Sequence, residues 1–243
     1  MADTHRSSLA IPRERRWVGT NMRHEIATRR VLYEIPGMAS VRIRRDEFRG
    51  ADGRSLPLAL YEPAATAGQA LVAILAGYPD PGFEQRLGCK FMEMEWTISI
   101  AKLIAASGMT AVTHSNRDPE PDALALMDHL NASGGKVGIW ATSGHGPVAL
   151  SAATKAACAV LTNPVTKTFC PNTPLLLVRS GKDETPGLNR ALDAFAAKAI
   201  EDNRPITLVN YPQAPHSFEL SIDSPDSRRI LKQGLEFLRA HLM

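Results

Sequence analysis

Cysteine is scarce in this chain: there are only three, and no two of them form a CxxC pair (Cys89, Cys158 and Cys170). An odd number without that spacing argues against a structural zinc site and against a disulfide framework. We therefore expect a protein of a reducing compartment.

Long apolar runs and a strong charge of one sign are also missing. No stretch reaches the roughly 18 apolar residues that a membrane span needs, and residues 1–30 lack the apolar centre of a signal peptide. The net charge of +3 is too small to indicate nucleic acid as a partner. We expect a cytoplasmic protein that binds neither a membrane nor nucleic acid.

Internal repeats, low-complexity tracts and interior linkers are absent as well. A chain of 243 residues with 44% hydrophobic and 22% charged residues fits one domain with a large core. We divide it into an N-terminal polar segment with a short helix, residues 1–30, and a single folded domain, residues 31–243. The sequence leaves open whether the chain forms a homodimer.

What is present is an alternation of strand and helix patterns. Two antiparallel strands are predicted at 41–45 and 56–61, joined by a turn at 49–53. Residues 78–92 are expected to form a loop. The remaining pattern predicts strands at 71–76, 110–114, 137–141, 157–161, 175–179 and 206–210, and helices at 91–107, 122–131, 147–155, 188–199 and 227–241. This order indicates an α/β protein with a mostly parallel sheet and helices on both faces.

The most informative segment is residues 136–147. An apolar strand ends on Ser143, and a helix follows at once, with Gly144, Gly146 and Pro147 at the junction. A junction of this kind exposes the serine oxygen at the tip of a sharp turn and points the next backbone N–H groups the same way. We predict that Ser143 is the nucleophile of an acyl-transfer reaction.

A serine hydroxyl needs a base, and in an open parallel sheet the functional groups collect beyond the carboxyl ends of the strands. The expected strand 206–210 is followed by His216, in a loop that contains Pro212 and Pro215. We predict that His216 is the base that activates Ser143. The alternative is an ordinary loop histidine.

The base in turn needs an acid that holds its tautomer. The expected strand 175–179 is followed by Asp183 and Glu184. We predict that Asp183 is the acid, because the shorter side chain fits a tight contact with His216 better. The alternatives are that Glu184 takes this role, or that Asp183 only caps the next helix.

The negative oxygen that forms during acyl transfer needs at least two hydrogen-bond donors. One is expected to be the backbone N–H of Gly144, directly after the nucleophile. The other is expected to be the N–H of Tyr78, after the strand 71–76, because Pro79 and Pro81 carry no N–H.

Taken together in this order, the motifs resemble those of the α/β-hydrolase superfamily and, within it, of dienelactone hydrolase-like enzymes. The resemblance covers residues 41–243 and rests on four segments: AGYP (76–79), WATSGHG (140–146), SGKD (180–183) and APHSF (214–218). It implies an eight-stranded sheet whose first two strands are antiparallel, and cleavage through an acyl-enzyme. Dienelactone hydrolases use cysteine where this chain has Ser143, which favours a serine esterase.

The chain departs from that pattern near the nucleophile. His145 stands where the family usually has glycine, so it either lines the pocket or packs against other residues. The connection 161–174 is too short for a helical cap domain. The side chains expected to line a substrate pocket, with core packing as the alternative for each, are Phe83, Phe91, Met92, His145 and Phe218.

These features predict a hydrolase of small carboxylic esters or lactones, with Ser143, His216 and Asp183 as its catalytic triad and with no metal and no cofactor. Acyl transfer or peptidase action would use the same residues, so the sequence does not separate these reactions. A non-catalytic ligand-binding protein on a hydrolase scaffold is the alternative outside enzymes.

Overall fold

The structure is a computed structural model that describes residues 24–64 and 70–243. The polar segment predicted at the start of the chain lies almost entirely outside the described residues. Of the short helix expected there, the described part contains a 3-10 turn, Glu25–Thr28. No helix in the described ranges has the length and apolar character needed to cross a lipid bilayer.

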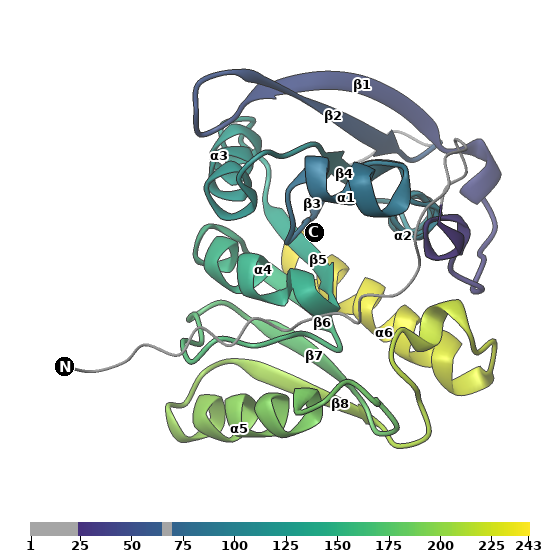
Figure 1. Cartoon of the computed structure of the whole chain (residues 1–243), viewed down its shortest axis with the longest axis vertical. Coiled ribbons are helices and arrows are strands. Elements are labelled where there is room, and N and C mark those ends of the chain that lie inside the picture. Colours follow the sequence, from purple (N-terminus) through teal and green to yellow (C-terminus); the bar gives the residue numbers. More distant parts are fainter. Residues whose placement is uncertain (1–23, 65–69) are drawn as a thin grey trace.

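In the described part of the chain, eight strands form one sheet in the order β1-β2-β4-β3-β5-β6-β7-β8. Figure 1 shows this order from top to bottom. β2 is antiparallel to both of its neighbours, and all later neighbours are parallel. The predicted eight-stranded, mostly parallel sheet is thus confirmed. The strands are β1 Arg42–Arg49, β2 Ser55–Glu62, β3 Leu71–Ile74, β4 Thr110–His114, β5 Val137–Thr142, β6 Cys158–Thr162, β7 Leu175–Ser180 and β8 Ile206–Tyr211.

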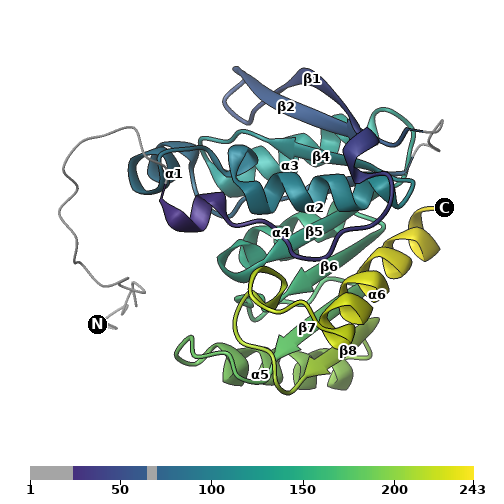
Figure 2. The same cartoon turned by 90° about the vertical axis from the view of Figure 1, so that its right-hand side faces the viewer.

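Helices cover both faces of the sheet, as predicted. Figure 2 shows α2 and α6 on the near face, while α3, α4 and α5 lie on the far face. Each face has its own hydrophobic core. The helices are α1 Asp80–Leu87, α2 Glu95–Ala106, α3 Pro119–Asn131, α4 Gly146–Ala152, α5 Leu188–Glu201 and α6 Pro225–Leu242.

Strand β5 shows how one sequence serves both cores. Successive side chains of a strand point to opposite faces. Ile139 therefore packs into the core beneath α3 and α4, while Trp140 packs into the core beneath α6. A Cβ atom at Gly234 of α6 would lie 3.0 Å from the Trp140 ring, so the helix sits directly on the indole. β5 is buried along its whole length and delivers Ser143 at its carboxyl end.

Two predicted boundaries are wrong around α1 and α2. Residues 78–92 are not a simple loop, because they contain α1. Pro79 is the N-cap of α1 and Pro81 lies in its first turn, where a missing N–H costs no helical hydrogen bond. The expected helix 91–107 is divided, because Met94 has extended backbone angles between the 3-10 turn Phe91–Glu93 and α2.

No cap domain separates the site from solvent at the position considered in the sequence. Residues 163–174, between β6 and β7, contain neither helix nor strand. The connections that follow β5, β7 and β8 are also short, and the candidate site lies on them.

Candidate active site

The three residues predicted as a triad come together at the carboxyl edge of the sheet. Ser143 follows β5, Asp183 follows β7 and His216 follows β8. His216 Nε2 lies 2.9 Å from Ser143 Oγ, and His216 Nδ1 lies 2.5 Å from Asp183 Oδ2. With the proton on Nδ1, the imidazole donates to the carboxylate and presents Nε2 as an acceptor to the hydroxyl. This arrangement can take a proton from serine.

Backbone hydrogen bonds between the connections after β7 and β8 hold the acid beside the imidazole. The N–H of Gly181 donates to the carbonyl of Tyr211, and the N–H of Lys182 to that of Ala214, both at 2.8 Å. A Cβ atom at Gly181 would collide with the carbonyl of Pro212, so the close approach requires glycine.

The carboxylate of Asp183 is itself held in place. Its side chain is fully buried, and Oδ1 accepts the N–H of Thr185 at 2.9 Å while Oδ2 faces the imidazole. Glu184, the alternative considered from the sequence, is exposed. The aspartate is therefore the carboxylate that reaches His216.

Ser143 occupies a backbone conformation that few residues with a side chain adopt. Its φ angle is 51°, in the left-handed region. The N–H of Val165 donates to its carbonyl at 2.9 Å, and a Cβ atom at Gly146 would collide with the carbonyl of Val165. The chain after β6 thus braces the strand-to-helix junction, and the junction has the sharp geometry expected from the sequence.

On the other side of Ser143, the ends of β3 and β5 touch through their backbones. A Cβ atom at Gly77 would lie 2.6 Å from the Gly144 carbonyl oxygen and 2.7 Å from the His145 Cα. In the described part of the chain, the backbone N–H groups of Tyr78 and Gly144 donate no hydrogen bond to protein. Both donors proposed for the oxyanion are therefore available.

His145 is a buried connector between these two strand ends. Its Nδ1 accepts the N–H of Gly77 at 2.6 Å, and its ring lies against Phe91 with centroids 4.5 Å apart. Phe83 stacks on it with an interplanar angle of 14°. Burial lowers the pKa of His145 to about 3, so the ring is neutral and Nδ1 keeps the lone pair that the amide needs. Of the roles left open in the sequence, the structure shows packing.

Most other side chains considered for a substrate pocket are core residues. Phe91 and Phe218 are 1% and 0% exposed, and Met92 is also buried. Phe218 packs edge-on against Tyr211. We therefore treat these three as packing beneath the site rather than as substrate contacts. Phe83 is half-buried and remains at the surface near the nucleophile.

Two buried carboxyl groups near the site were missed in the sequence. Glu219 accepts the indole N–H of Trp96 at 3.0 Å through Oε1, and its Oε2 has no protein partner. Asp80 accepts the Ser115 hydroxyl at 2.5 Å. Burial raises the pKa of both carboxyl groups. Nothing in the local pattern marks them, because their burial comes from distant parts of the chain.

Metal binding has no visible basis among the residues that the structure describes. No group of three or more His, Cys, Asp or Glu side chains in them is placed to hold a metal ion.

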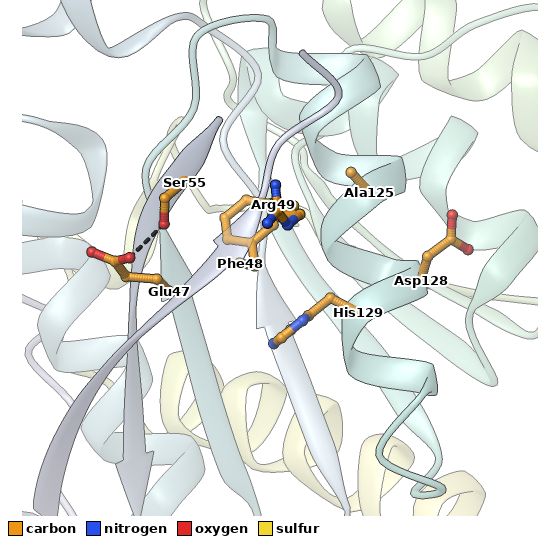
Figure 3. Close-up of a pocket in the computed structure, with 7 residues that line it drawn as sticks. All are labelled: Glu47, Phe48, Arg49, Ser55, Ala125, Asp128 and His129. Carbon is orange, nitrogen blue, oxygen red and sulfur yellow. Dashed lines mark hydrogen bonds between the residues drawn. The ribbon is translucent and has the colours of Figure 1, made fainter. Parts of the chain in front are cut away.

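A hollow of about 670 Å³ lies away from the triad, between the β1–β2 hairpin and α3 (Figure 3). Within it, Ser55 donates a hydrogen bond to Glu47. None of the residues predicted for the site lines this hollow. Its lining is Glu47, Phe48, Arg49, Ser55, Ala125, Asp128 and His129.

No protein-family model and no curated protein sequence matches this chain. Solved structures do match it. A bacterial heroin esterase is 15% identical, with a TM-score of 0.67 over 85% of this chain and 86% of that one. A hyperthermophilic esterase from the archaeon Pyrobaculum calidifontis is 16% identical, with a TM-score of 0.65 over 84% and 88%.

Brefeldin A esterase, described as a bacterial homologue of human hormone-sensitive lipase, is 13% identical, with a TM-score of 0.66 over 88% of this chain and 81% of that one. Identities this low carry information about architecture alone. The structural similarity, together with the strand order and the helices on both faces, shows that this chain has the α/β-hydrolase fold.

Proposed function

We propose that this protein is a serine hydrolase that cleaves small carboxylic esters or lactones through an acyl-enzyme. The observation that carries the proposal is the unbroken hydrogen-bonded series Ser143–His216–Asp183 at the carboxyl edge of the sheet. The esterases among the similar structures support the same class of reaction.

In the first half of the reaction, Ser143 Oγ attacks the carbonyl carbon of the ester while His216 Nε2 accepts the hydroxyl proton. Asp183 stabilises the imidazolium that results. The negative oxygen of the tetrahedral intermediate accepts the N–H groups of Gly144 and Tyr78. When the intermediate collapses, the ester C–O bond breaks, and His216 gives its proton to the leaving alcohol.

In the second half, water attacks the acyl-enzyme and His216 accepts a proton from it. The second tetrahedral intermediate releases the carboxylic acid, and the proton returns to Ser143 Oγ. A lactone follows the same course, except that its alcohol and acid remain one molecule. Each step is acid–base and nucleophilic chemistry of the side chains, so the proposed reaction requires no cofactor.

The short connection 163–174 contains no helix or strand, so it forms no cap domain over the triad. Tyr78 and Phe83 are the aromatic side chains near Ser143 that reach the surface. Within the hydrolases, we propose a dienelactone hydrolase-like esterase in which serine replaces the nucleophilic cysteine. The motifs AGYP, SGKD and APHSF support this subtype.

The test compares wild type with Ser143→Ala on p-nitrophenyl acetate and a panel of short esters and lactones. We expect the variant to lose at least about 10⁴-fold in kcat/KM with its fold intact. Ser133→Ala is the matched control, because Ser133 is exposed just after α3 and its hydroxyl donates to the Leu130 carbonyl.

Mass spectrometry after reaction with a fluorophosphonate identifies the nucleophile directly. The adduct is expected on the peptide that contains Ser143, and the Ser133→Ala protein should be labelled as fast as wild type. A wild type that neither turns over any substrate nor becomes labelled would contradict the proposal. Tight binding of an ester without turnover would point to a binding protein instead.

A further inference from the structure

The segment that carries the Tyr78 N–H is attached to the fold on both sides. Before it, the N–H of Gly77 donates to His145 Nδ1 at 2.6 Å. After it, Asp80 begins α1, and its backbone N–H donates to the carbonyl of Asn116 at 3.3 Å. These two attachments set the position of the Tyr78 N–H, since in the described part of the chain this N–H has no protein acceptor of its own.

The carboxylate of Asp80 strengthens the second attachment. Its Oδ2 accepts the Ser115 hydroxyl at 2.5 Å and the backbone N–H of Asn116 at 3.2 Å. Both donors lie in the connection that follows β4, the strand beside β3 in the sheet. Ser115 is itself fixed, because its N–H donates to the carbonyl of Pro57 on β2 at 2.9 Å. Three hydrogen bonds thus tie the start of α1 to the end of β4, and the Asp80 side chain accepts two of them.

Asp80 occupies a place that is costly for a carboxyl group. The residue is 4% exposed, and burial raises its pKa. Removing a charged group from water lowers stability unless hydrogen bonds or an opposite charge compensate. Residues that break such a rule are typical of functional sites, where geometry matters more than stability. The geometry that Asp80 controls is that of the chain just before α1, which includes the Tyr78 N–H.

We propose that Asp80 is a positioning residue for ester hydrolysis: its carboxylate fixes the start of α1 on the connection after β4 and thereby holds the Tyr78 N–H in place for the oxyanion. This inference rests on the proposed function. Asp80 neither touches the substrate nor moves a proton. A displaced donor weakens a hydrogen bond that the tetrahedral intermediate needs more than the bound ester does, so the effect falls on kcat rather than on KM.

Asp80→Ala and Asp80→Asn test the proposal as a pair. For Asp80→Ala we expect kcat, counted per Ser143 labelled by the fluorophosphonate, to fall about 10- to 100-fold while KM stays within about threefold. Asp80→Asn should keep kcat within about threefold of wild type, because the amide oxygen can accept the same two hydrogen bonds. A boronic acid inhibitor, which forms a tetrahedral adduct on serine, should lose affinity for Asp80→Ala by the same factor as kcat.

Thr173→Val is the control for lost stability. The Thr173 hydroxyl is buried and donates to the Ala153 carbonyl at 2.6 Å, just before β7 and thus at the opposite edge of the sheet from the triad. Losing this buried hydrogen bond should lower the melting temperature and leave kcat per labelled site at the wild-type value. Asp80→Ala should lower both quantities, and this separates positioning from a purely structural role.

An Asp80→Ala protein with wild-type kcat and inhibitor affinity would overturn the inference, as would a change confined to KM or an Asp80→Asn protein as slow as Asp80→Ala. If Asp80→Ala does not fold, Ser115→Ala decides, because it removes only the donor at 2.5 Å. A lower kcat with matching loss of inhibitor affinity supports the inference, and wild-type values overturn it. Failure of the proposed function looks different, because the wild type itself would then neither turn over esters nor react at Ser143.

Discussion

On one side of Ser143, polar side chains from the connections after β7 and β8 meet through hydrogen bonds of 2.5 and 2.9 Å. On the other side, the ends of β3 and β5 press together through glycine backbones, and His145 fills the space beside them. The first side contains a buried carboxylate, and the second contains a neutral buried imidazole among aromatic rings.

This difference determines how each side fails. On the triad side, which contains Asp183 and His216, replacing one polar atom alters proton transfer but leaves the packing unchanged. On the oxyanion side, which contains Gly77, Gly144 and His145, one added methyl group would overlap closely packed backbone atoms. We therefore expect substitutions on the triad side to lower activity alone, and substitutions on the oxyanion side to lower both activity and stability.

Among the substitutions that compare the two sides, Asp183→Asn should give the largest effect on activity. The amide NH₂ favours the wrong imidazole tautomer, so we expect kcat to fall about 10³- to 10⁴-fold with little change in melting temperature. Steady-state kinetics and calorimetry measure the two quantities. Glu184→Gln is the matched control and should keep wild-type activity. If Glu184→Gln were the inactive variant, the acid would have been assigned to the wrong neighbour.

Gly77→Ala should damage both properties. Its Cβ would lie 2.6 Å from the Gly144 carbonyl oxygen, so the two strand ends must separate. We expect the free energy of unfolding to fall by about 1–3 kcal/mol in urea titrations, with a large loss of kcat.

Gly82→Ala is the control for this substitution. Gly82 lies inside α1, and a Cβ atom added there would have no neighbour within 4 Å. The added methyl group should raise helix stability by up to about 1 kcal/mol and leave activity intact. Equal stabilities of the two alanine variants would contradict the distinction between the two sides.

His145 gives the oxyanion side a pH dependence of its own. The unfolded chain protonates this imidazole near its ordinary pKa of 6.5, whereas the folded protein resists protonation down to about pH 3. Stability contributed by the neutral ring is therefore present above pH 6.5 and lost as the pH falls toward 3. The loss approaches about 1.4 kcal/mol per pH unit for a single proton.

His145→Asn removes that titration and keeps an oxygen that can accept the Gly77 N–H. Its unfolding free energy should decline less steeply than that of wild type between pH 6.5 and 4. The buried His114, whose pKa burial lowers to about 4, titrates in both proteins and interacts with His145, so the curves are compared above pH 4. Parallel curves for wild type and variant would show that His145 is not neutral in the fold.

Glu219→Gln should give the smallest effect. Burial raises the pKa of this carboxyl group, so the stability of the wild type falls as the pH rises from 4.5 through the raised value. Glutamine keeps the acceptor for Trp96 and carries no charge. At pH 7 we expect an increase of up to about 1 kcal/mol, which shrinks toward pH 4.5.

The exposed Glu236→Gln on α6 is the comparison for Glu219→Gln, and should change stability by less than about 0.5 kcal/mol at any pH. A Glu219→Gln variant that is less stable than wild type at pH 7 would show that the carboxylate is satisfied in the folded protein.

The placement of Ser143, Asp183 and His216 could be predicted because it follows from the order of strands. Each residue lies in the connection that follows a predicted strand, and parallel strands end at one edge of the sheet. The sheet itself was predictable for the same reason, since its buried strands stand out as short apolar runs between helical patterns.

The prediction of a loop at 78–92 was wrong because proline occurs both in loops and in the first turn of a helix. Pro79 and Pro81 suggest a stiff loop, yet both are compatible with the start of a helix, and Gly88 ends that helix in the left-handed conformation. For His145 the sequence left pocket lining and packing open, and Glu219 was not singled out. Their partners, Gly77 and Trp96, lie 68 and 123 residues away, and only the folded chain brings them into contact.

The position of His216 after β8 also decides when in the life of the chain the serine becomes reactive. β8 pairs with β7, and the segments synthesised before it already contain Ser143 and Asp183. A growing polypeptide that has not yet added β8 carries a serine with no base beside it. If the proposed function holds, reactivity toward esters thus arises only once synthesis has passed this strand and it has docked on the sheet.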